Sequence, residues 1–168
     1  GYTEPTLDPV AMAETAADLS ASLLLNPNRA ARMVLQHSRD ANQLSLQNLL
    51  TSIDSRTIKS APVNGYEGTI QRGINTAVFR NMLGLATNRN ASPDVSAITL
   101  AHIKNLQSWL NSQASSSKDN NWKSHYAYLS GLVTQMEKDP SSFETPPAPY
   151  TPPGAPIGSF DPTLGCEF

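Results

Sequence analysis

The chain has 168 residues, which is the length of one ordinary domain and enough to bury a hydrophobic core without disulfides or metals. Its net charge is −2, and its 12 Lys and Arg residues are scattered, so we expect no broad basic surface for nucleic acid. Apolar runs such as Leu23–Leu25 are far shorter than the roughly 20 residues of a membrane span, so we also expect no such span. Cys166 is the only cysteine, which excludes an internal disulfide.

Proline placement marks where helices begin and where the helical part of the chain ends. Three prolines each follow a residue that commonly caps helices, in the pairs Asp8-Pro9, Asn26-Pro27 and Ser92-Pro93. Eight of the 13 prolines lie at or after Pro140. The first pattern predicts helices over residues 9–25, 27–39 and 93–115, and the second predicts a proline-rich segment after them.

The first half of the chain shows helical spacing of apolar residues. In the helix over residues 9–25 we expect one face to carry Val10, Ala13, Ala17 and Leu24. The helix over residues 27–39 would bury a small set, Ala31, Val34 and Leu35. A third helix is predicted to begin with Ser45 as its cap and to carry Leu46, Leu49, Leu50, Ile53 and Thr57.

The second half repeats this pattern with bulkier side chains. A helix from Tyr66 to Thr87 is predicted from the stripe Ile70, Ile74, Val78, Met82 and Leu85. Its glycines, Gly68, Gly73 and Gly84, indicate close helix approach. The next helix would be lined by Val95, Ile98, His102, Leu106, Trp109 and Leu110. The last helix has the most regular seam and should be central to the core: Trp122, Tyr126, Leu129, Val133 and Met136.

These elements predict an all-α fold, a single bundle of about five to six helices over residues 1–138. Residues 139–168 are predicted to form an extended proline-rich tail, because closely spaced prolines favour polyproline II. Tyr150, Ile157 and Phe160 are more apolar than a solvated linker needs. We therefore expect part of this tail to pack on the helices.

No constellation of catalytic or metal-binding residues is apparent. His37, His102 and His125 fall on different predicted helices without a second ligand one turn away, and zinc sites need three or four converging ligands. His102 is expected to be a hydrogen-bonded residue at the core boundary. Motifs for acyl or phosphoryl transfer are missing, and the carboxylates that could pair are expected mostly on solvent faces: Glu14, Asp18, Asp54 and Glu67. We predict no catalytic, cofactor-binding or metal-binding residue in this chain.

A series of short motifs nevertheless resembles one family. In order along the chain, the motifs are Asn26–Met33, Ile70–Arg72, Val78–Leu83, Ser92–Ala97, His125–Leu129 and Pro152–Gly158. This series resembles the C-terminal helical region of large bacterial zinc-dependent metalloproteases of the Met-zincin type. Such proteins carry a His-Glu-x-x-His-x-x-Gly-x-x-His zinc site in a preceding catalytic domain, and this chain lacks that motif.

The resemblance implies that the chain is a non-catalytic scaffold and not itself an enzyme. Its partner would be the catalytic domain of the same polypeptide, which would hold the zinc and act in the periplasm or outside the cell. The residues predicted to contact a partner are Arg29, Arg32, Tyr150, Ile157 and Phe160.

Two other functions are compatible with the sequence. A free-standing helical binding module would have a sizeable exposed apolar patch. An enzyme with a dispersed active site would have a deep pocket where His102 or His125 meets a carboxylate.

Overall fold

The computed structural model describes residues 9–25, 29, 33, 43–88 and 93–143 of the chain. These residues form α-helices and one short 3₁₀ helix, and none of them lies in a strand. The elements are α1 (Pro9–Leu25), α3 (Gln43–Arg56), α4 (Gly65–Ala86), α5 (Pro93–Ser116), α6 (Asn120–Lys138) and the 3₁₀ helix η1 (Pro140–Phe143). The predicted all-α bundle is confirmed.

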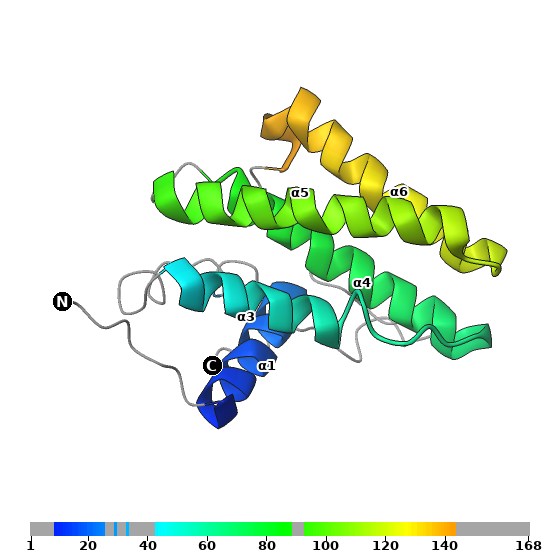
Figure 1. Cartoon of the computed structure of the whole chain (residues 1–168), viewed down its shortest axis with the longest axis horizontal. Coiled ribbons are helices and arrows are strands. Elements are labelled where there is room, and N and C mark those ends of the chain that lie inside the picture. The colour runs from blue at the N-terminus through cyan, green and yellow to red at the C-terminus, as the bar shows by residue number, and fades with distance from the viewer. Residues whose placement is uncertain (1–8, 26–28, 30–32, 34–42, 89–92, 144–168) are drawn as a thin grey trace, which may run out of the picture.

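The helices are arranged around α4. Figure 1 shows α5 and α6 on one side and α1 and α3 on the other, with α4 running between them. The α5–α6 pair is antiparallel, because Lys104 pairs with Glu137 at 2.6 Å while Gln107, one turn later, donates to the carbonyl oxygen of Ser130 at 3.1 Å. The most extensive helix contact in the described part of the chain is this one.

Most helix starts agree with the sequence. Pro9 and Pro93 are the first residues of α1 and α5. Asp119 caps α6, since its carboxylate accepts hydrogen bonds from two backbone N–H groups at 2.9 and 3.1 Å. The predicted cap Ser45 is wrong: α3 begins two residues earlier, at Gln43, because Gln43 and Leu44 are themselves good helix formers. The predicted helix over residues 27–39 lies largely outside the described residues.

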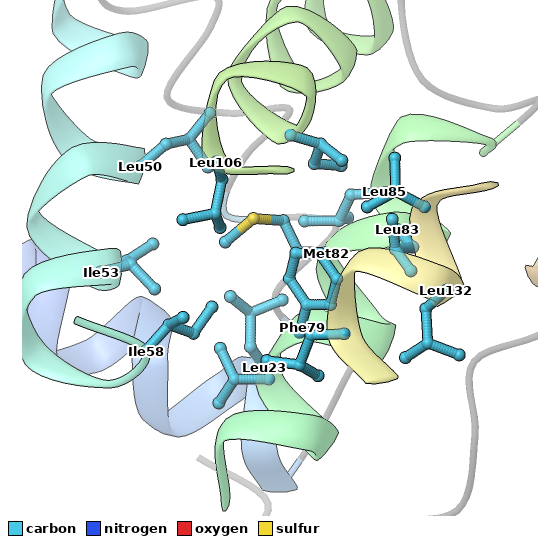
Figure 2. Packing of buried hydrophobic residues seen from close by; sticks show 14 of the residues in the cluster. Leu23, Leu50, Ile53, Ile58, Phe79, Met82, Leu83, Leu85, Leu106 and Leu132 are labelled. Atoms are coloured by element: carbon cyan, nitrogen blue, oxygen red, sulfur yellow. The ribbon is translucent and has the colours of Figure 1, made fainter. Parts of the chain in front are cut away.

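The core combines residues from all five α-helices of the described part of the chain. Figure 2 shows Phe79 and Met82 in the middle, with Ile53 and Ile58 on one side and Leu132 on the other. The predicted seam of α6 is confirmed in full, and so is the leucine-rich face of α3: Leu46, Leu49, Leu50 and Ile53 are buried.

The predicted face of α1 is wrong for Val10 and Ala13, whereas Ala17 and Leu24 are half-buried and Leu24 packs against the core. Val10 is 64% exposed and Ala13 is also exposed, whereas Ala16, Leu19 and Leu23 are completely buried. The larger leucine side chains set the face, since they bury more apolar area against α3 and α4 than the alanines could.

The prediction for α4 missed part of its buried surface. Val78, Met82 and Leu85 are buried as expected, but Phe79 and Leu83 are fully buried as well. A single stripe cannot account for this, because α4 contacts α1 on one side and α5 and α6 on another.

Two of the α4 glycines lie close to connecting segments rather than to another helix. A Cβ on Gly68 would collide with the carbonyl oxygen of Val63 in the α3–α4 loop. A Cβ on Gly84 would lie 3.1 Å from the carbonyl oxygen of Phe143. The prediction of close helix approach is therefore wrong at Gly68, where the partner is a loop, while the partner of Gly84 is the short 3₁₀ helix η1.

We expect Gly68→Ala to destabilise the fold by about 1–3 kcal/mol, because the loop backbone must move to admit the methyl group. The matched control is Gly131→Ala in α6, where a Cβ meets nothing within 4 Å. That change should stabilise by up to about 1 kcal/mol through helix propensity. Urea denaturation measures both, and equal effects of the two substitutions would contradict the steric explanation.

The segment expected to be extended begins with a folded turn. Pro140–Phe143 form η1, and the Phe143 ring is buried where η1 contacts α4 and α6. The Arg80 guanidinium lies over this ring, 5.5 Å from its centroid. Residues 144–168, including Tyr150, Ile157 and Phe160, lie outside the described residues.

Candidate functional site

A groove of about 410 Å³ lies where α1, α3 and α4 meet. Its described lining comes from α1, from α4 and from the end of α3 with the residue that follows: Ser20, Ala21, Leu24, Arg56, Thr57, Ile74 and Val78. Ala21 and Arg56 are exposed, whereas Val78 is buried. The groove thus has an apolar wall and one positively charged side chain.

The polar groups of the groove fit recognition better than catalysis. The Ser20 hydroxyl donates to the carbonyl oxygen of Ala16 at 2.7 Å, and the Thr57 hydroxyl donates to that of Ile53 at 2.8 Å. Since each hydroxyl has used its proton, it can only accept from a ligand. Arg56 supplies the donors. The described lining includes no histidine, carboxylate or cysteine to activate a nucleophile.

A buried acid–base pair joins α3 to α5. His102 Nε2 lies 2.7 Å from Asp54 Oδ2, and the two side chains are only 11% and 2% exposed. His102 is at the core boundary as predicted, but its contact with Asp54 does not meet hydrogen-bond geometry, so the predicted hydrogen bond at Nε2 is not formed. The prediction that Asp54 lies on a solvent face is wrong, because Asp54 falls one turn after Leu50, on the buried side of α3. Asp54 Oδ1 has no hydrogen-bond partner among the described residues.

This pair lies outside the described lining of the groove. A histidine oriented by an aspartate needs a nucleophile or substrate within reach. Neither His102 nor Asp54 lines the groove. The pairing of a histidine with a carboxylate, which a dispersed active site would require, is present, but neither side chain belongs to the described lining of the groove.

An aromatic cluster lies between α5 and α6. Trp109 meets Tyr126 edge to face at 5.5 Å, and Trp122 meets His125 in the same way at 5.4 Å. Two cations lie over the indole rings: Lys59 is 5.3 Å from the Trp109 ring and Arg72 is 5.2 Å from the Trp122 ring.

Trp122 also fixes the loop that precedes α4. Its indole Nε1–H donates to the carbonyl oxygen of Val63 at 2.9 Å. The loop is held from α4 as well, because Gln71 donates to the Ser60 hydroxyl at 2.6 Å and accepts from the Val63 N–H at 3.2 Å. The two cations and the buried rings therefore act as a structural clamp on residues 59–63.

His125 is buried in this clamp, and its Nε2 has no hydrogen-bond partner among the described residues. Burial, and secondarily the nearby Arg72 charge, lowers the pKa of His125 to about 4. The imidazole is therefore neutral in the folded protein near pH 7. Burial also raises the pKa of Tyr126.

We expect acid to destabilise the protein through His125. The unfolded chain binds a proton below about pH 6.5 and the folded chain only near pH 4, so the free energy of unfolding falls as the pH drops through this window. The loss from this group should approach roughly 3 kcal/mol. The measurement is urea denaturation at several pH values, with wild type compared with His125→Phe. Identical pH profiles for the two proteins would contradict this role of His125.

The residues predicted to contact a partner are mostly outside the described part. Arg29 is half-buried, whereas Arg32, Tyr150, Ile157 and Phe160 lie outside the described residues. Arg56 was not predicted as a site residue, and Thr57 was predicted only as part of the buried face of the third helix. Both become neighbours of Leu24 and Ile74 only through helix packing. The burial of Asp54 could have been predicted from the sequence, since Asp54 continues the spacing of Leu46 and Leu50.

The described residues do not fit a zinc centre, because they contain no group of three or more His, Cys, Asp or Glu side chains able to hold a metal ion. None of the described helices is long and apolar enough to cross a membrane. Comparison with protein-family models, with curated proteins and with solved structures found no match for this chain.

Proposed function

We propose that this chain is the non-catalytic C-terminal helical domain of a bacterial zinc-dependent metalloprotease of the Met-zincin type. It would act as a structural or interaction scaffold for the catalytic domain of the same polypeptide. The starting point is the ordered series of motifs from Asn26–Met33 to Pro152–Gly158. The zinc and its ligands would belong to the preceding domain, and the protein would be periplasmic or secreted.

The observation that carries this proposal is the position of the motif residues in the core. In the motif Val78–Leu83, five of the six residues have buried side chains and the sixth, Arg80, lies over Phe143. In His125–Leu129, the buried residues are His125, Tyr126 and Leu129. Val95, in the motif that opens α5, is also buried. Motifs whose residues pack the helices together are what a scaffold would retain.

Polar residues of these motifs also connect helices. The Asn81 side-chain amide donates to the carbonyl oxygen of Leu23 and so ties α4 to the end of α1. His125 packs against Trp122, the side chain that holds the α3–α4 loop. Each of these groups is used within the bundle, which supports a structural role for the motifs.

The test uses the parent reading frame and two purified proteins. We expect the frame upstream to encode the zinc motif. We also expect this chain to bind the separately expressed catalytic domain in calorimetry and to hydrolyse no peptide alone. Arg29→Glu with Arg32→Glu should weaken binding, while the exposed Lys123→Glu should not. Peptide hydrolysis by this chain alone, or an upstream frame without the motif, would overturn the proposal.

A free-standing helical binding module is the second candidate, and the groove between α1, α3 and α4 favours it. The exposed large apolar residues of the described part are spread over different elements rather than gathered on one helix: Val10, Val63, Tyr66, Leu100 and Tyr128. A module of this kind would keep its full activity without a neighbouring domain. Loss of function when the chain is separated from its parent would exclude it.

A further inference from the structure

A segment of the same chain carries side chains that are complementary to those lining the groove between α1, α3 and α4. Residues 144–168 contain Glu144, Asp161 and Glu167 but no Lys or Arg. They also contain a stretch without proline, Ile157–Asp161, between Pro156 and Pro162. That stretch combines two large apolar side chains with one carboxylate, which matches an apolar wall beside a single cation.

We propose that residues 157–161 dock in this groove. Ile157 and Phe160 would pack on Leu24, Ile74 and Val78, and the Asp161 carboxylate would pair with Arg56. The docking is within one molecule and does not depend on the proposed role in a metalloprotease.

Arg56 is the cation best suited to receive a carboxylate. Four other cations already have partners: Lys59 lies over Trp109, Arg72 over Trp122 and Arg80 over Phe143, while Lys104 pairs with Glu137. Arg56 is exposed, and no ion pair or aromatic contact engages it among the described residues. Its guanidinium can therefore bind a carboxylate with two parallel hydrogen bonds.

The two hydroxyls of the groove fit a peptide backbone. Ser20 and Thr57 have donated their protons within their own helical turns, so each oxygen can accept an N–H. Because residues 157–161 contain no proline, each of them has a backbone N–H to donate. A polyproline stretch would lack many of these donors.

The linker is long enough for this docking. Phe143 is anchored beside Gly84, and Val78 and Ile74 lie six and ten residues earlier on the same helix. This separation is roughly 9 to 15 Å along the helix axis, plus about 15 to 20 Å to pass around the helix. The 13 residues between Phe143 and Ile157 can span roughly 40 Å as polyproline II. The linker can therefore span more than the distance from Phe143 to the groove.

The test uses the single cysteine of the full-length chain. A nitroxide on Cys166 should broaden the amide NMR signals of the groove, notably Ser20, Ala21 and Thr57. Arg56→Asp or Asp161→Arg should each lower the ratio of docked to free tail about fivefold, as expected for an ion pair at the surface. Combining the two substitutions should restore the broadening.

Matched controls separate the proposal from general charge effects. Lys123→Asp, on the exposed side of α6, and Glu144→Lys, next to the anchor, should leave the broadening unchanged. If Arg56→Asp disturbs folding, Asp161→Arg decides alone, since it leaves the helices untouched. Broadening that persists in Asp161→Arg, or that occurs outside the groove, would overturn the proposal. Broadening that passes only from one molecule to another, in a mixed sample of differently labelled molecules, would also overturn the proposal.

Discussion

Substitution of His102 by leucine is expected to destabilise the protein by roughly 3 to 5 kcal/mol, because it leaves the Asp54 carboxylate buried without its partner. Asp54 is 2% exposed, and its Oδ1 has no hydrogen-bond partner among the described residues, so the 2.7 Å contact to His102 is its main polar contact. Urea denaturation at pH 7 measures the change in the free energy of unfolding.

The double variant Asp54→Leu with His102→Leu should recover most of this loss, since apolar residues can replace a buried polar pair at little cost. The coupling energy between the two sites then gives the strength of the pair. Lys104→Ala is the exposed control, because Lys104 and Glu137 are 48% and 44% exposed and such pairs contribute up to about 1 kcal/mol. A loss from His102→Leu no larger than that from Lys104→Ala would contradict a stabilising role of the buried pair.

Trp122→Ala should have an effect at least as large, a loss of roughly 4 kcal/mol or more in the free energy of unfolding. The indole is 1% exposed, holds the Val63 carbonyl by its N–H and supports the Arg72 guanidinium on its face. Truncation removes all three contributions and leaves a cavity between α6 and the α3–α4 loop.

Two further variants separate these contributions. Trp122→Phe keeps most of the apolar volume but loses the hydrogen bond to Val63, so it should cost about 1–2 kcal/mol. Trp109→Ala is the matched aromatic control, because Trp109 is only half-buried and should cost less than Trp122→Ala. Equal losses at the two tryptophans would show that the deeper burial of Trp122 and its hydrogen bond to Val63 add nothing to stability.

The docking proposal and the scaffold proposal can be tested independently, because they use different residues. A tail segment in the groove would compete with any external peptide for Arg56, Leu24 and Ile74. A scaffold that binds a catalytic domain through Arg29 would be unaffected by this competition, since Arg29 is not part of the described groove lining. Binding of the catalytic domain to wild type and to Asp161→Arg therefore separates the two.

The sequence predicts a helix best where the residues at its ends and the spacing of its apolar residues indicate the same element. In α6, the regular spacing of Trp122, Tyr126 and Leu129 predicted both the element and its buried face, and the structure adds the Asp119 cap at the start of the helix. Prediction failed on α1, where a string of small residues offers several equivalent faces. It was incomplete on α4, where a second buried face accompanies the predicted stripe.

The polar sites were harder to foresee because they depend on contacts distant in sequence. Asp54 and His102 meet only when α3 packs on α5, and Trp122 reaches Val63 only when α6 packs beside the α3–α4 loop. The groove likewise combines residues as far apart as Ser20 and Val78.

By itself, the sequence determined the helical class and most helix limits, since capping, proline placement and apolar spacing act over one or two turns. Only the tertiary structure decided which face of α1 is buried, that α4 is buried on two sides and that Asp54 has a partner inside the core. The reason is physical: burial and electrostatic environment depend on which helices surround a side chain, and that arrangement is a property of the whole bundle.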